Sequence, residues 1–370
     1  GVISIAVFLG SCQAGISSQT EPGRITKAVP PEIQVATSTR EISPPAPVDE
    51  TQPPNDNGDS IESSEYPSGS RVELSFLGPE STGLDPETNP FAIRVDVILQ
   101  SPDGSTKILP AFYDGNGRGG LDGSVWKVRL IPNQAGTWDY EVNSEDPSLD
   151  GAAGSFEVVI NPKCDHSNSV DNNLKCKGHL EHVGGHYLQF QDGEFWLKTG
   201  LDDPENILGT AFGDWEAKRT QIDLLHQLGV NSIYVISNNI GGDRKDTWPW
   251  VGETESQARS NADRFDVARL QAWEDFFSYV QEKGIVLHFV FNDDSAWKGY
   301  DEYLYIREMV ARFGYLPGII WNVGEEANEI FTDREQLAFA AMISDLDPYN
   351  HPVTVHRKAP WPFLGEQEFE

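Results

Sequence analysis

Five apolar segments in the second half of the chain are followed by polar side chains, which are carboxylates and amides, with some indoles, after the first four and His356 and Arg357 after the fifth. These segments are 195–199, 231–236, 285–291, 318–323 and 353–356. A carboxyl group can donate and accept protons, amides and acids bind hydroxyl groups, and an indole face stacks on the C–H face of a sugar ring. Loops are polar in general, but four successive loops of this composition favour a carbohydrate site. The residues that we expect to contact the carbohydrate are Asp203, Glu205, Asn206, Asp243, Trp248, Trp250, Asn292, Asn322, Glu325 and His356.

The five apolar segments alternate with amphipathic segments that we predict to be helices, at 216–228, 267–283, 300–313 and 333–346. Continuous apolar strands that alternate with helices form a parallel sheet covered by helices. Two architectures fit, a (β/α)₈ barrel and an open doubly wound sheet. No GxGxxG or Walker motif follows any predicted strand. This absence argues against an open doubly wound sheet that binds a nucleotide. In a barrel, the polar residues would lie at the C-terminal rim, where active sites are found.

Residues 71–160 have a different pattern, in which apolar and polar side chains alternate along short segments such as 72–76 and 126–130. Turn residues separate these segments and no amphipathic helix intervenes. The pattern predicts an antiparallel β-sandwich of the immunoglobulin-like type. The acidic, glycine-rich segment 114–117 invites comparison with a calcium loop, but Arg118 stands where an oxygen ligand belongs. We therefore expect a glycine-rich hairpin there.

The N-terminal residues have the composition of an export signal followed by a tether. Residues 2–9 are apolar but too few to span a bilayer. Leu9-Gly10-Ser11-Cys12 follows them and resembles a bacterial lipobox, in which the cysteine is acylated; the alternative is a secretory signal with a chance cysteine. Residues 13–68 are rich in Pro, Ser and Thr, which predicts a disordered tether. We divide the chain into a signal remnant (1–12), a tether (13–68), the sandwich (69–161), a connector (162–190) and part of a barrel (191–370).

The chain has three cysteines. If Cys12 is acylated, Cys164 and Cys176 remain in a polar stretch of an exported protein, which predicts a disulfide between them. A zinc site with His166 or His179 is the weaker alternative, because no CxxC spacing is present. We expect neither a metal nor a cofactor.

The charge of the chain limits its partners. Its 370 residues include 58 Asp and Glu against 27 Lys and Arg, a net charge of −31. The length suits two or three domains. Such acidity argues against a nucleic-acid binder, which needs a basic face for phosphates, and against docking on anionic lipid through a polybasic patch.

The fourth apolar segment continues into Trp321-Asn322-Val323-Gly324-Glu325-Glu326. This stretch resembles the end of strand four in clan A glycoside hydrolases, where a Trp-Asn pair leads to Asn-Glu. The resemblance implies that Glu326 is the catalytic general acid/base. Glu325 departs from it, because the family has an Asn there that holds a substrate hydroxyl. Two adjacent carboxyl groups would raise the pKa of one of them, or could bind a cation or be solvated.

Most of residues 71–357 is similar to bacterial exported proteins that join an N-terminal immunoglobulin-like domain of unknown function to a glycoside-hydrolase-like barrel. The matching stretches are 112–115, 126–129, 186–188, 203–206, 241–243, 248–250, 264–267, 287–290, 321–322, 324–326 and 346–349. The resemblance implies a multidomain chain, with the sandwich followed by an incomplete (β/α)₈ TIM-type barrel. It supplies no substrate.

The resemblance implies a retaining glycoside hydrolase that cleaves O-glycosidic bonds of a polysaccharide or oligosaccharide. In clan A the nucleophile is a second Glu at the end of strand seven. Residues 195–370 are fewer than the roughly 250 of a typical barrel. We therefore expect the nucleophile to lie outside them and this fragment to be inactive. The alternative is a non-catalytic carbohydrate-binding or adhesion protein; nothing supports a lyase or esterase, since no GxSxG is present.

With the lipobox, the expected location is the bacterial cell envelope, at the outer membrane or cell surface. A lipid anchor would hold the protein to the membrane there, and its partner would be a carbohydrate rather than a nucleic acid.

Overall fold

The computed structural model describes residues 65–164, 173–184, 187–200 and 203–369. Cys12, His166 and nearly all of the predicted tether lie outside the described residues. Within these ranges, no helix is both long and apolar enough to cross a membrane.

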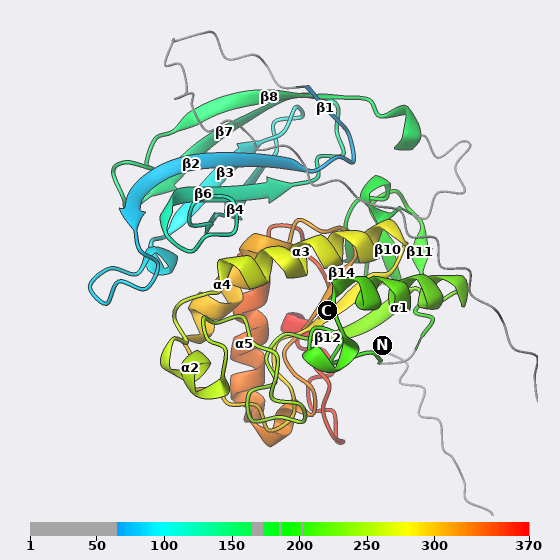
Figure 1. Ribbon diagram of the computed structural model, residues 1–370. Coiled ribbons are helices and arrows are strands. Elements are labelled where there is room, and N and C mark those ends of the chain that lie inside the picture. The colour runs from blue at the N-terminus through cyan, green and yellow to red at the C-terminus, as the bar shows by residue number, and fades with distance from the viewer. Residues whose placement is uncertain (1–64, 165–172, 185–186, 201–202, 370) are drawn as a thin grey trace, which may run out of the picture. The chain divides into compact units, whose positions relative to one another are not determined.

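Two facing sheets form the first part of the described chain (Figure 1). Their strands are β1 (Glu65–Pro67), β2 (Val72–Ser81), β3 (Val95–Gln100), β4 (Thr106–Pro110), β5 (Phe112–Tyr113), β6 (Gly123–Leu130), β7 (Gly136–Ser144) and β8 (Ala153–Val159). One sheet has the order β1-β8-β7-β3-β4 and the other β2-β6-β5. Only β1 pairs in parallel, with β8. The rings of Phe76 and Tyr140 meet between the sheets at 5.9 Å, so the two apolar faces pack into a β-sandwich that begins at β1, slightly before the predicted boundary.

The glycine-rich segment after β5 forms a hairpin that its own backbone closes. Gly115 has a φ of +56°, and a Cβ atom there would collide with the carbonyl oxygen of Gly120. Asn116 Oδ1 accepts hydrogen bonds from the N–H groups of Arg118 and Gly120, both at 2.9 Å. The Asp114 carboxylate binds the Lys127 ammonium at 2.9 Å. These contacts use the oxygens that a calcium loop would offer to the ion.

A small antiparallel sheet follows the sandwich and a disulfide. Cys164 and Cys176 are bonded, with an S–S length of 2.05 Å. The sheet has the strands β9 (Leu180–His182), β10 (Leu188–Phe190) and β11 (Phe195–Trp196), in the order β11-β10-β9. The strand that we predicted at 195–199 is therefore shorter, and it belongs to this antiparallel sheet rather than to the parallel one. Thr199 nevertheless borders the parallel sheet, because its N–H and C=O groups both bond to Asn231.

The other four predicted strands form one parallel sheet. They are β12 (Ser232–Ile236), β13 (Val286–Val290), β14 (Ile319–Asn322) and β15 (Val353–Thr354), and they lie in sequence order. Every pair is parallel. The carboxyl ends of these strands therefore meet at one edge, which we call the C-terminal edge of the sheet.

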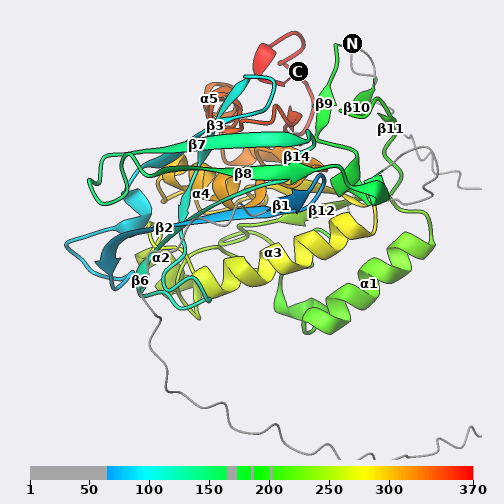
Figure 2. The same ribbon diagram turned by 90° about the horizontal axis from the view of Figure 1, so that it is seen from above.

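Helices connect these strands: α1 (Trp215–Gln227), α2 (Glu255–Ser260), α3 (Val267–Glu282), α4 (Glu302–Phe313) and α5 (Asp333–Leu346). Short 3₁₀ turns are η1 (Pro90–Ala92), η2 (Pro162–Cys164), η3 (Leu174–Cys176), η4 (Thr210–Phe212), η5 (Ala327–Glu329) and η6 (Gln367–Phe369). The four predicted helices are confirmed within two residues at each end, whereas α2 was not predicted. The first three begin at side-chain N-caps, Asp214, Asp266 and Asp301, and the predicted capping box of Thr332 and Glu335 starts α5. Figure 2 shows α1 and α3 side by side.

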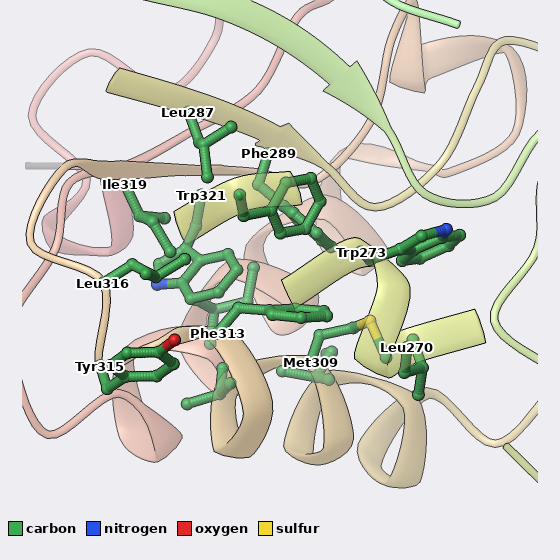
Figure 3. Packing of buried hydrophobic residues seen from close by; sticks show 14 of the residues in the cluster. Leu270, Trp273, Leu287, Phe289, Met309, Phe313, Tyr315, Leu316, Ile319 and Trp321 are labelled. Atoms are coloured by element: carbon green, nitrogen blue, oxygen red, sulfur yellow. The ribbon is translucent and has the colours of Figure 1, made fainter. Parts of the chain in front are cut away.

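Aromatic side chains fill the space between the parallel sheet and its helices (Figure 3). Phe289 of β13 contacts Phe313 of α4 with ring centroids 5.9 Å apart, and Trp321 of β14 at 5.3 Å. Trp321 also donates a hydrogen bond through Nε1 to the buried Asp347 carboxylate at 3.1 Å. This packing fixes the end of β14, from which the candidate site residues extend.

Buried ion pairs join the sandwich to α3 and α4. Arg129 of β6 pairs with Glu274 of α3, and both side chains are buried. Arg307 of α4 pairs with Asp96 of β3 at 2.9 Å. Its guanidinium also donates to the carbonyl oxygen of Val95 at 2.6 Å. Glu274 of α3 and Arg307 of α4 thus have charged partners in the sandwich.

Candidate active site

Segments from five parts of the chain meet at the C-terminal edge of the parallel sheet. Glu205 joins it through its backbone, since its carbonyl oxygen accepts a hydrogen bond from the N–H of Ile236 at 2.8 Å. The neighbouring Asn206 accepts one from Asn239 Nδ2 at 3.0 Å through its side chain. These bonds hold the segment after β11 against the end of β12. Asp203, two residues earlier, is exposed.

Asn292 and Asn322 hold the strand ends rather than present their amides to solvent. Asn292 donates through Nδ2 to the carbonyl oxygen of Val323 at 3.1 Å and accepts from the Tyr300 hydroxyl at 2.5 Å. Asn322 Nδ2 donates to the Tyr234 hydroxyl at 3.1 Å. Both side chains are completely buried. We predicted them to contact substrate, and this burial corrects that expectation: their polar atoms are used inside the protein.

Glu325 lies three residues beyond the end of β14, next to Glu205. Its N–H donates to the carbonyl oxygen of Asn292 at 2.8 Å, and its side-chain Oε2 is buried without a hydrogen-bond partner among the described residues. Its Oε1 lies 3.7 Å from His356 Nδ1, beyond hydrogen-bonding range. Burial and the Glu205 carboxyl raise the pKa of Glu325 to about 8, and burial also raises the pKa of Glu205. These are two of the predicted binding residues, and the structure brings them together.

Glu326 points to a different group of residues. Its backbone has a φ of +41°, and its Oε2 binds the Lys358 ammonium at 2.7 Å. Lys358 also binds Glu329. Carboxylate oxygens of Asp294, Glu326 and Glu329 lie within 4.8 Å of one another, the spacing of a possible cation site, but the ammonium group already neutralises two of them.

Asp293 and Asp294 complete the acidic edge and were not among the predicted site residues. Asp293 accepts hydrogen bonds from the N–H groups of Asp243 and Asp294, both at 2.9 Å. Burial raises the pKa of Asp293 to about 7. Burial and the nearby Asp243 carboxylate raise the pKa of Asp294 as well. Their position directly after the third apolar segment was the sequence signal that could have identified them. Asp243 itself is exposed at the same edge.

The two predicted stacking residues are not open to a sugar. Trp250 is 0% exposed and packs on Tyr300 and Tyr305, with ring centroids 5.1 and 5.3 Å away. This burial corrects the expectation that its face binds substrate. Trp248 is almost as buried and borders a pocket of about 510 Å³. The pocket is also lined by Trp215, Trp273 and Asp246, among others.

At this edge the exposed or half-buried groups therefore include seven site residues and the Lys358 ammonium that binds one of them; the seven are Asp203, Glu205, Asp243, Asp294, Glu325, Glu326 and His356. Carboxyl groups with different environments can act as proton donors, proton acceptors or ligands for sugar hydroxyls. The arrangement is suited to acid–base chemistry on a neutral, hydroxyl-rich molecule.

Residues 69–145 match a family described as a domain of unknown function, DUF5060. No curated protein sequence matches the chain. Among solved structures, the chain is similar to one described as a "putative glycoside hydrolase" from Bacteroides vulgatus ATCC 8482, at 19% identity and a TM-score of 0.65. The match covers 83% of this chain and 58% of that one. A family 5 glycoside hydrolase from the same organism matches over 55% of this chain and 45% of its own, at 16% identity and a TM-score of 0.40.

The first of these structures supports the fold, and the chain spans just over half of its length. The described residues therefore form a multidomain fold with a β-rich part, similar to that of the protein described as a "putative glycoside hydrolase".

Proposed function

We propose that the protein hydrolyses O-glycosidic bonds of a polysaccharide or oligosaccharide. The observation that carries the proposal is the convergence of carboxyl groups at the C-terminal edge of the parallel sheet, where Glu205, Asp243, Asp293 and Glu325 come from four separate segments. Similarity to a glycoside-hydrolase fold supports the same class of chemistry.

The proposed mechanism is a retaining one with two carboxyl groups. One donates a proton to the leaving oxygen and later takes a proton from water, and the other attacks the anomeric carbon. The resemblance of segment 319–326 assigns the first role to Glu326. The nucleophile is not assigned to a residue of this chain. In this proposal Asp203, Glu205, Asp243 and His356 bind sugar hydroxyls.

The proposal is tested with the full-length protein and a panel of polysaccharides, by measuring released reducing ends. Glu326→Gln should lose activity on any polysaccharide that the wild type cleaves, because the amide cannot donate the proton. If wild type releases sugar and Glu326→Gln is equally active, the assignment of Glu326 is wrong.

A non-catalytic carbohydrate-binding protein is the second candidate. It is favoured by the bond between Lys358 and Glu326, which holds the predicted acid/base in an ion pair. Affinity electrophoresis in gels that contain each polysaccharide separates the two candidates. Retardation of the full-length protein without any released reducing ends would favour binding alone.

The proposed architecture is an immunoglobulin-like sandwich and a TIM-type barrel. Support comes from the two facing sheets and from the four parallel strands in sequence order, three of them followed by a helix that leads to the next strand. We also propose that Cys12 is acylated and anchors the protein in the bacterial cell envelope. In a bacterial host, Cys12→Ala should move the protein from the membrane fraction to the soluble fraction and abolish labelling by a fatty acid.

A further inference from the structure

We infer that the pocket bordered by Trp215 is a second carbohydrate-binding position, which holds a neutral sugar unit beside the C-terminal edge of the parallel sheet. The choice of a carbohydrate as the ligand rests on the proposed function, whereas binding in the pocket does not require that the protein cleaves the polysaccharide. Binding and cleavage are therefore measured separately.

The pocket lies between the first turns of two helices and the loop after β12. Trp215 is the first residue of α1, Arg269 and Trp273 belong to the first two turns of α3, and residues 245–248 of the loop complete the lining. The two helices lie side by side (Figure 2). The volume of about 510 Å³ falls within the roughly 300–1,000 Å³ of sites that bind small molecules.

Trp215 is the indole that has surface left for a ligand. Trp248 and Trp273 also line the pocket, but they are 6% and 2% exposed, whereas Trp215 is only half-buried. Its ring is held by Phe276, with ring centroids 5.7 Å apart, and by the Lys218 ammonium, 5.2 Å from the ring centre. A fixed, partly exposed indole can stack on the C–H face of a sugar ring with little loss of its own freedom.

Hydrogen bonds hold the polar side of the pocket in place. Asp246 accepts bonds from the N–H and the hydroxyl of Thr210, at 2.9 and 3.0 Å. The buried Asn239 accepts bonds from the N–H groups of Asp246 and Thr247, at 3.0 and 2.7 Å. Its amide also donates to Asn206 of the C-terminal edge, at 3.0 Å. One side chain therefore fixes both the loop of the pocket and a segment of the edge.

The charges in the pocket favour an uncharged ligand. Arg269 and Glu255 are already paired with neighbouring side chains. Lys245 and Glu253 are exposed, and no ion pair or hydrogen bond joins their charged groups to other described residues. The groups that remain are thus one ammonium and the carboxylates of Glu253 and Asp246. They offer donors and acceptors to hydroxyl groups, and their near balance of charge gives no gain to a strongly charged ligand.

The pocket is close to the C-terminal edge along the chain. Thr210 comes five residues after Glu205, so their Cα atoms are at most about 18 Å apart. Asp246 comes three residues after Asp243, which limits that separation to about 11 Å. A polysaccharide that lies along the edge can therefore place another of its sugar units in the pocket.

The pocket is tested with the full-length protein by affinity electrophoresis in gels that each contain one polysaccharide of the panel. Trp215→Ala should bind at least about tenfold more weakly than wild type to a polysaccharide that retards wild type, the loss expected when an aromatic hot spot is removed. Lys245→Met should also bind more weakly, and it loses no contact within the described part of the protein. Phe195→Ala is the matched control, because Phe195 is 63% exposed and does not line the pocket, and it should bind like wild type.

A Tm measurement establishes that each variant is folded, and Lys245→Met decides alone if Trp215→Ala is not. Wild-type binding by the folded variants, or no retardation of wild type by any polysaccharide, would overturn the pocket assignment. Reducing ends released by wild type are measured on the same panel. If binding depends on the pocket but no sugar is released, the proposed function fails and the pocket assignment holds. If sugar is released and the variants bind like wild type, the pocket assignment fails alone.

Discussion

Arg312 Nη1 of α4 lies 3.2 Å from Asp114 Oδ1 of the sandwich, and the two side chains are 0% and 1% exposed. The same guanidinium donates to the Glu308 carboxylate at 2.5 Å and to the carbonyl oxygen of Tyr113 at 2.7 Å. A helix of the parallel-sheet part and a loop of the DUF5060-matching part therefore satisfy one buried cation together. A buried ion pair therefore links the part of the chain that matches the domain of unknown function to α4.

Arg312→Met should lower the free energy of unfolding by about 3–5 kcal/mol, because it leaves the Glu308 carboxylate buried without this partner and removes one of the two cations that bind Asp114. Urea denaturation followed by tryptophan fluorescence measures the change. The matched control is Arg94→Met, because the Arg94 side chain is 60% exposed in its pair with Asp96. That variant should lose less than about 1 kcal/mol. Equal effects of the two substitutions would contradict a special role for the buried pair.

Cys164→Ser should lower the free energy of unfolding by roughly 2–3 kcal/mol, because the Cys164–Cys176 bond closes a short loop and restricts the unfolded chain. Denaturation with and without a reductant gives the measurement: the reductant should destabilise wild type and leave the variant unchanged. Cys176→Ser is the matched control and should behave in the same way. A variant as stable as oxidised wild type would show that the bond adds nothing.

Local signals account for the parts of the fold that the sequence predicted well. Side-chain caps such as Asp266 and apolar periodicity depend only on residues a few positions apart in the sequence. The predicted start of α3 is therefore confirmed, one residue after that cap. Strand partners are chosen over long distances, so the pairing of Phe195–Trp196 with β10 could not be read from its own residues. The site shows the same limit. Residue type and position predicted that Glu205 and Glu325 lie at one edge, but not that Asn292 and Asn322 beside them are completely buried.

His179 should make the folded protein less stable in mild acid. Burial lowers its pKa well below the ordinary 6.5, and its ring stacks on Tyr349 at 4.0 Å with Nε2 buried and unpaired among the described residues. In the unfolded chain the His179 imidazole therefore binds a proton near pH 6.5, whereas in the folded protein it stays neutral at that pH. The free energy of unfolding consequently decreases as the pH falls below that value. His179→Asn should show a smaller loss between pH 7.5 and pH 5.5, measured by urea denaturation at each pH. Parallel curves for the variant and wild type would count against this explanation.

Trp250→Ala should reduce stability rather than carbohydrate binding. The side chain is fully buried against Tyr300 and Tyr305, so truncation leaves a cavity and should lower the free energy of unfolding by about 3–5 kcal/mol. Trp361→Ala is the control, because Trp361 is 43% exposed and its removal should cost less than about 1 kcal/mol. Urea denaturation measures both, and affinity electrophoresis at a temperature where both variants are folded measures binding. Weaker binding by folded Trp250→Ala, with stability unchanged, would return Trp250 to the sugar-stacking role that its sequence position suggested.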